Sequence, residues 1–90
     1  MKELVLDAAK LMEQPDPIEA LASIFGFKGS DLYTVQMALS AMEEDWQVSV
    51  INKPEGNETW MLIADLLEGV QQHSAHFFLI WSDPKERAKL

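Results

Sequence analysis

The sequence contains no cysteine, which excludes disulfides, thiolate metal sites and thiol catalysis. Long apolar runs are absent as well. The longest, AHFFLIW at residues 75–81, is far shorter than the roughly 18–20 residues that a membrane-spanning helix needs. The opening stretch, MKELVLDAAKLMEQPD, has acidic side chains inside its apolar part, which is not the pattern of a signal peptide. We therefore expect a cytoplasmic protein with no membrane segment.

Positive charge is scarce. The 90 residues include 15 acidic and 7 basic side chains, and the net charge is −8. Residues 1–45 carry nine acidic residues against three lysines, whereas residues 46–90 carry six against four basic ones. Nucleic-acid binding usually depends on a basic face, because the release of counterions from phosphates supplies much of the affinity. The charge therefore predicts no nucleic-acid binding, and it favours a basic protein partner.

Motifs that carry catalysis are also missing. The chain has no glycine-rich phosphate loop, no H-E-x-x-H pair and no nucleophile elbow. His73 and His76 lie where a helix is expected to give way to a strand, and carboxylates such as Asp65 and Glu68 follow the solvent face of a helix. A catalytic group needs a cleft that shifts its pKa, and so short a chain rarely forms one alone. We predict that the protein is not an enzyme and has no catalytic residue, cofactor or bound metal.

The first half of the chain has the pattern of three helices. Apolar residues recur at helical spacing over residues 2–13, and the QPDP that follows ends this helix. Asp16 is suited to cap a second helix that starts with Pro17 and stops at Gly26. Ser30 is expected to cap a third helix. The apolar stripe of this helix consists of Leu32, Val35, Leu39, Met42 and Trp46.

The second half has the pattern of a small sheet. WQVSVIN alternates in side-chain character and predicts a strand over about residues 46–52, and AHFFLIWS predicts another over about residues 76–82. The segment between them is either a helix capped by Asn57 or a strand over residues 58–63. We favour the helix because its periodicity covers more residues. The final SDPKERAKL favours a short helical tail. The prediction is a single α+β domain over residues 1–90, with a three-helix half followed by a small sheet and one further helix.

Apolar side chains are abundant for a chain of this length. Hydrophobic residues make up 48% of the sequence, with three tryptophans, four phenylalanines and five methionines, yet such a chain buries only about 60–65% of its unfolded surface. In the last strand, alternation sends Phe77, Leu79 and Trp81 to one face and Phe78 and Ile80 to the other. One set should pack on the helices, and the other should either meet a helix of the same chain or lie in an interface. A free strand edge also invites pairing across a two-fold axis, so we predict a homodimer.

These features together predict a non-catalytic protein-binding module. In character it resembles small acidic inhibitor, immunity or adaptor proteins, among them the immunity proteins that neutralise toxins and the inhibitors made by phages. The acidic residues are expected to face a basic partner, and the aromatic strand is expected to form the subunit contact. The predicted binding residues are Glu43, Glu44 and Asp45 for charge, and Phe78, Ile80 and Trp81 for association.

Two other functions remain open. Three helices followed by a strand pair around NKPEGNE would give the outline of a winged-helix transcription regulator, although the expected exposed positions of the third helix hold no lysine or arginine. GSDLYTVQMALSAMEEDWQVSV, at residues 29–50, resembles the second helix of acyl carrier proteins, which are also small and acidic. That resemblance implies a phosphopantetheine group on Ser30. The match departs from the family pattern because Gly29 stands where the family has an acid, and Asp31 separates the serine from Leu32.

Overall fold

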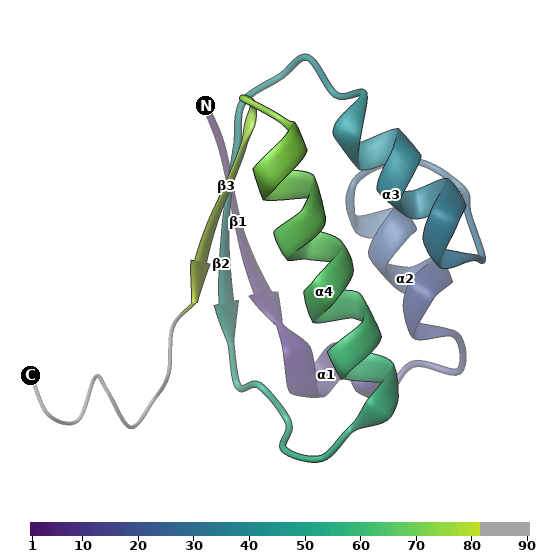
Figure 1. Ribbon diagram of the computed structural model, residues 1–90. Helices are drawn as coiled ribbons and strands as arrows, with labels where there is room; N and C mark the ends of the chain where they lie inside the picture. The colour runs from purple at the N-terminus through teal and green to yellow at the C-terminus, as the bar shows by residue number, and fades with distance from the viewer. Residues whose placement is uncertain (82–90) are drawn as a thin grey trace, which may run out of the picture.

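The computed structural model describes residues 1–81 (Figure 1). The helical tail expected at SDPKERAKL falls in residues 82–90 and lies outside the described residues. The predicted α+β class is confirmed, since the structure combines helices with a three-stranded sheet. In chain order the elements are β1 (Lys2–Asp7), α1 (Ala8–Met12), α2 (Pro17–Ile24), α3 (Leu32–Ser40), β2 (Trp46–Ile51), α4 (Glu58–His73) and β3 (Phe77–Trp81).

The three strands are parallel and lie in the order β1-β2-β3. In the register of the sheet, Val48 of β2 lies between Leu4 of β1 and Leu79 of β3. Figure 1 shows that the helices all lie on one side of this sheet. The described part of the chain is thus a sheet with one covered face and one open face.

The N-terminal segment differs from the prediction. Residues 2–13 do not form one helix, because residues 2–7 are a strand and only Ala8–Met12 is helical. Leu6 is buried and Val5 next to it is exposed, which is the period of two that belongs to a strand. The segment pairs along its whole length with β2, and the N–H of Lys2 donates to the carbonyl of Asp45 at 2.8 Å. The apolar pattern of residues 2–7 fits a helix as well as a strand. Pairing with β2, which is distant in the sequence, stabilises the strand.

Helix α2 confirms the prediction at both of its ends. The carboxylate of Asp16 accepts a hydrogen bond from the backbone N–H of Glu19 at 3.2 Å, and Pro17 is the first helical residue. Gly26, just beyond the helix, has φ +88°, a backbone conformation that glycine adopts without steric cost. The two ends of this helix are therefore determined by residues close to them in the sequence.

Helix α3 begins and ends at residues that differ from the prediction. Its cap is Asp31 rather than Ser30. One carboxylate oxygen of Asp31 accepts from the N–H of Thr34 at 2.9 Å, and the other accepts from the Thr34 hydroxyl at 2.8 Å. The helix also stops at Ser40, so Trp46 does not extend its stripe but opens β2. Because Trp46 still turns toward the helices, its apolar character fits either element.

The segment between β2 and β3 is a helix, α4, as favoured above, and no strand forms over residues 58–63. The side chain of Asn57 caps it as predicted, accepting from the N–H of Trp60 at 2.9 Å. The face that packs on the rest of the protein is fully periodic, with Ile63, Leu67 and Val70 completely buried. None of the helices in residues 1–81 has the length and apolar character needed to cross a bilayer.

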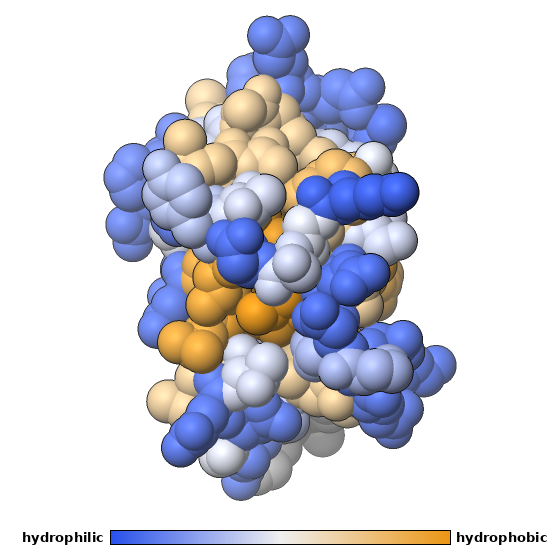
Figure 2. All heavy atoms as spheres, turned by 90° about the vertical axis from the view of Figure 1, so that its right-hand side faces the viewer, coloured by the Kyte–Doolittle hydropathy of each residue, from blue (hydrophilic) through white to orange (hydrophobic). Residues whose placement is uncertain are grey.

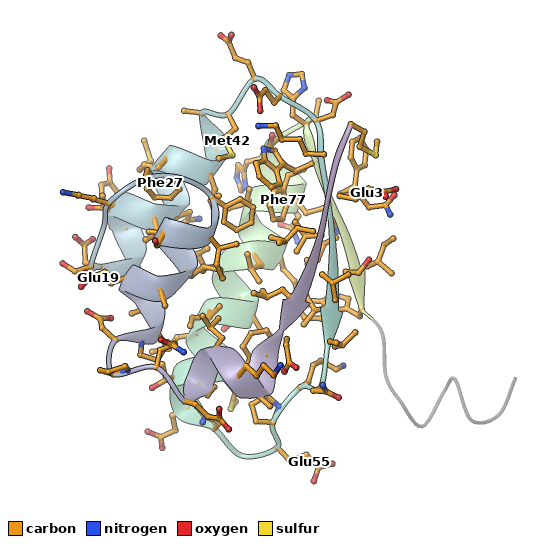
Figure 3. The ribbon with its side chains drawn as sticks, turned by 180° about the vertical axis from the view of Figure 1, so that it is seen from behind. Glu3, Glu19, Phe27, Met42, Glu55 and Phe77 are labelled. Atoms are coloured by element: carbon orange, nitrogen blue, oxygen red, sulfur yellow. The ribbon has the colours of Figure 1, made fainter. Side chains whose placement is uncertain are left out.

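The core lies between the sheet and the helices. Phe25, just after α2, stands edge-on to Trp46 with ring centroids 5.0 Å apart, and it lies 6.1 Å from the ring of Phe77. Figure 3 shows Phe77 pointing from the sheet into this layer. Full burial of a side chain of this size contributes about 1.5–3 kcal/mol. Because Phe77 packs in the core and successive side chains of a strand point to opposite faces, Phe78 faces away from the helices.

Candidate protein-binding site

The open face of the sheet carries every second residue of each strand. Two complete rows cross it in register: one contains Glu3, Gln47 and Phe78, and the other contains Val5, Ser49 and Ile80. Figure 3 shows Glu3 pointing away from the helices, as this alternation requires. We define the open face as Glu3, Val5, Asp7, Gln47, Ser49, Ile51, Phe78 and Ile80.

Several large apolar side chains of this face reach solvent. Phe78 and Ile80 are each 43% exposed and Val5 is 65% exposed, whereas Phe77 on the covered face is 2% exposed. Parallel sheets are almost always covered on both faces, because the helices that connect their strands lie on those faces. In residues 1–81 only one face is covered. Within residues 1–81, the open face is therefore the surface that most resembles a protein interface.

The structure brings together two of the three residues predicted for association. Phe78 and Ile80 lie side by side on β3 at the open face. Trp81 lies on the covered face instead, where its ring stands edge-on to that of Trp60 with centroids 6.3 Å apart. The ammonium of Lys53 lies 5.4 Å from the centroid of the Trp81 ring. Trp81 thus helps to close the core at one end of the sheet.

The three predicted acidic residues lie in the loop between α3 and β2 and are exposed. Two of them lie against basic side chains of the same chain. Lys2 Nζ lies 2.7 Å from Glu44 Oε2, and His76 Nδ1 lies 2.8 Å from Asp45 Oδ1. Glu43 makes no ion pair with any described residue. Exposed ion pairs of this kind are weak and exchange readily with other partners, so the loop can still present acidic groups to a basic protein.

The two histidines turn toward different partners. His73 Nδ1 lies 2.8 Å from the carbonyl oxygen of Gly69 in its own helix, whereas His76 Nδ1 meets Asp45. Across residues 1–81 no three histidine, aspartate or glutamate side chains gather in a way that could hold a metal ion. The HSAH segment connects the end of α4 to the start of β3.

The structure differs from the outlines expected of a winged-helix regulator and of an acyl carrier protein. Residues around NKPEGNE connect β2 to α4, and β2 and β3 are parallel, so they do not form the hairpin of a wing. Ser30 is exposed and lies one residue before the cap of α3. The helix that follows belongs to a fold that contains a three-stranded sheet, whereas acyl carrier proteins are helical.

Apolar side chains also reach the surface on the helical side. The exposed ones are Ile24 on α2, Tyr33 and Met37 on α3, and Met61 and Leu62 on α4. Figure 2, which shows part of this side, has an apolar region in its middle that hydrophilic residues border and cross. This surface is the ordinary outer side of amphipathic helices, and it is a weaker candidate than the open face.

A groove beside β1 is a feature that the sequence analysis missed. It has a volume of about 710 Å³ and lies between the carboxyl end of β1, α1 and α2. Leu11 and Ala20 line its interior, and Asp16 and Glu19 stand among its polar residues. The alternation in KELVLD was the signal that could have revealed it. Interpreting that segment as a helix concealed both the strand and its free edge.

Comparisons of the chain with protein-family models, with curated proteins and with solved structures find no match. The candidate surfaces are defined by this structure alone.

Proposed function

We propose that the protein is a non-catalytic protein-binding module of the cytoplasm that forms a homodimer through the open face of its sheet. The observation that carries the proposal is the exposure of Phe78 and Ile80, each 43%, on the bare face of a parallel sheet. A second copy supplies an identical face, and two such faces pack about 10 Å apart as in a β-sandwich. The water excluded from these side chains provides the driving force.

The distribution of charge on the open face supports a contact centred on β3. Glu3 and Asp7 lie on β1, at the opposite edge of the sheet from Phe78 and Ile80. If the two-fold axis passes near β3, the acidic groups of both copies stay at the rim, where water screens their repulsion. Gln47 and Ser49, on the strand between, are able to donate and accept hydrogen bonds at the edge of the apolar contact.

The second part of the proposal is a basic protein partner for the acidic surface. The chain has a net charge of −8, and the exposed Glu43 makes no ion pair within residues 1–81. A negative surface speeds encounter with a positive one and disfavours acidic competitors. This arrangement fits a small inhibitor, immunity or adaptor protein, in which one surface holds two copies together and another meets the target.

The dimer is tested with two matched charge insertions. Phe78→Glu places a carboxylate in the middle of the proposed contact, whereas Met61→Glu places one at another exposed apolar position, on α4 and away from the open face. Sedimentation velocity over a dilution series from micromolar to submillimolar protein should show dimers for the wild type and for Met61→Glu, and monomers for Phe78→Glu. A wild type that sediments as a monomer at every concentration contradicts the proposal.

A further inference from the structure

The two edges of the sheet are not equivalent. In a parallel ladder, alternate residues of a strand turn both backbone polar groups toward the same neighbour. The N–H of Lys2 donates to Asp45, so residues 2, 4 and 6 pair with β2 and the backbone groups of Glu3 and Val5 point to the free edge of β1. No group within residues 1–81 forms a hydrogen bond with the N–H of either residue. This edge of the sheet can accept another strand.

At the opposite edge of the sheet, one backbone donor already bonds to a side chain. On β3 the backbone N–H of Leu79 points to the free edge and donates to Gln71 Oε1 of α4 at 2.6 Å. The helix thus satisfies the central donor of that edge. Proteins commonly protect exposed edge strands in such ways, because an unprotected edge pairs with other chains. Because the central donor of β3 is occupied, β1 is the more accessible edge for an added strand.

The groove beside β1 fits the side chains of an added strand. Such a strand sends alternate side chains to the two faces of the sheet. One set enters the groove, whose apolar residues include the buried Leu11 and, on α2, Ala20 and the 41%-exposed Ile24. The other set lies on the open face beside Val5. Figure 3 looks onto this side of the molecule, with β1 in front and α2 beside it.

The charges around the edge are mostly negative. On the open face Glu3 and Asp7 flank Val5, and in the groove Asp16 and Glu19 outnumber Lys10. The backbone N–H of Lys10 donates to one carboxylate oxygen of Asp7 at 3.1 Å, and the side-chain amide of Asn52 donates to the other at 3.1 Å. Both bonds lower the pKa of that carboxyl. Lysine or arginine on the added strand would form favourable cross-strand pairs with Glu3 and Asp7.

From this geometry we infer that the edge of β1 and its groove bind an extended, basic segment of a partner protein, which adds to the sheet as a fourth strand. Apolar side chains of the segment fill the groove, and its lysine or arginine side chains lie on the open face opposite Glu3 and Asp7. The inference specifies the partner chemistry of the proposed protein-binding function and rests on it. It uses the edge of β1 and the β1 side of the open face, whereas the dimer contact is centred on β3, at the other edge of the sheet.

The first test uses two short end-capped peptides as probes, one alternating valine with lysine and one alternating valine with glutamate. Affinity is measured by isothermal titration calorimetry, and amide hydrogen exchange is followed by NMR on the isotope-labelled protein. The lysine peptide should bind at least about tenfold more tightly than the glutamate peptide, a difference of about 1.4 kcal/mol. On binding, exchange should slow at the amides of Glu3 and Val5 while that of Leu79 is unchanged. Equal binding of the two peptides, or unchanged exchange at Val5, overturns the inference.

The second test removes the free donor of the edge. Val5→Pro deletes the outward N–H, and proline is tolerated on an edge strand where that group faces solvent; Val5→Ala keeps the N–H and serves as the control. The proline variant should bind the lysine peptide at least about tenfold more weakly than the alanine variant, through the lost bond and the bulk of the ring. Equal affinities overturn the inference. Should circular dichroism show Val5→Pro unfolded, Ile24→Lys at the exposed rim provides the same test through charge and lost apolar contact.

The outcomes separate this inference from the proposed dimer. The Phe78→Glu monomer should bind the lysine peptide as the wild type does, because Phe78 lies two strands away from the edge of β1. If the wild type is a monomer and still binds the peptide at Glu3 and Val5, only the dimer is wrong. Protection of Glu3 and Val5 without peptide overturns the inference. Protection that grows with protein concentration would identify a second copy as the occupant, and protection at every concentration would identify the chain itself.

Discussion

At the scale of single residues, side chains with a hydrogen-bonding oxygen decide where helices begin. Asp7, Asp16, Asp31 and Asn57 each accept a bond from the backbone N–H three residues further on. Asp16 and Asn57 were predictable because capping is a local interaction between close neighbours in the chain. The sequence did not distinguish Asp31 from Ser30 as the cap of α3, since either side chain can cap a helix. The structure shows why aspartate is preferred, since its two oxygens engage both the N–H and the hydroxyl of Thr34.

The cap of α3 leads to a prediction about pH. The N–H and hydroxyl of Thr34 stabilise the carboxylate of Asp31 and lower its pKa from the ordinary value of an aspartate. A lowered pKa stabilises the folded state above about pH 4, and that contribution is lost as the pH falls through the lower, folded-state pKa. Asp31→Asn keeps an oxygen for the Thr34 N–H but does not titrate. Urea unfolding between neutral pH and pH 2.5 should therefore show a shallower loss of stability in the variant. Identical profiles for the two proteins would contradict this account.

At the scale of elements, the length of a periodic pattern separates the correct predictions from the wrong one. Helix α4 has 16 residues and keeps a period of 3.6 throughout, so its identity follows from the chain alone. In β1 the pattern covers only six residues, Lys2–Asp7, and the apolar residues that follow allow it to continue as a helix. Short apolar segments are ambiguous in this way because both elements can bury a few adjacent side chains.

The two sides of α4 provide a test of its packing. Leu67 is completely buried in the core, whereas Leu62 on the same helix is 53% exposed. Leu67→Ala should lower the free energy of unfolding by about 2–5 kcal/mol, because it removes buried methyl groups and leaves a cavity. Leu62→Ala should change it by less than about 0.5 kcal/mol, as exposed positions usually do. Chemical denaturation of the two variants beside the wild type measures both values. Comparable losses in the two would mean that Leu62 is also covered.

At the scale of the whole molecule, the arrangement of layers determines which surfaces remain for binding. All helices lie on one face of a parallel sheet, which leaves the other face without cover from residues 1–81 (Figure 1). The excess of apolar residues already predicted that some of them would remain exposed. Only the layers show that in β3 the exposed residues are Phe78 and Ile80, and that Trp81 faces the core.

A homodimer makes thermal stability depend on concentration. Because association favours the folded state by mass action, the melting temperature of the wild type should rise by a few degrees for each tenfold increase in protein concentration. The Phe78→Glu monomer should melt at one temperature throughout, since its unfolding involves a single chain. Differential scanning calorimetry over a hundredfold range of concentration gives the comparison. If the melting temperature of the wild type does not depend on protein concentration, the predicted dimer is wrong.

The amino-acid sequence alone determined the features that depend on close neighbours: the caps at Asp16 and Asn57, the stop at Gly26, the periodicity of α4, the alternation of β2 and β3, and the acidic surface. Tertiary structure decided that residues 2–7 are a strand, that the sheet is parallel, and that a groove lies beside its free edge. The physical reason is distance along the chain. A strand is stabilised by backbone partners, and those of β1 come from residues 45–51, which only folding brings to its side.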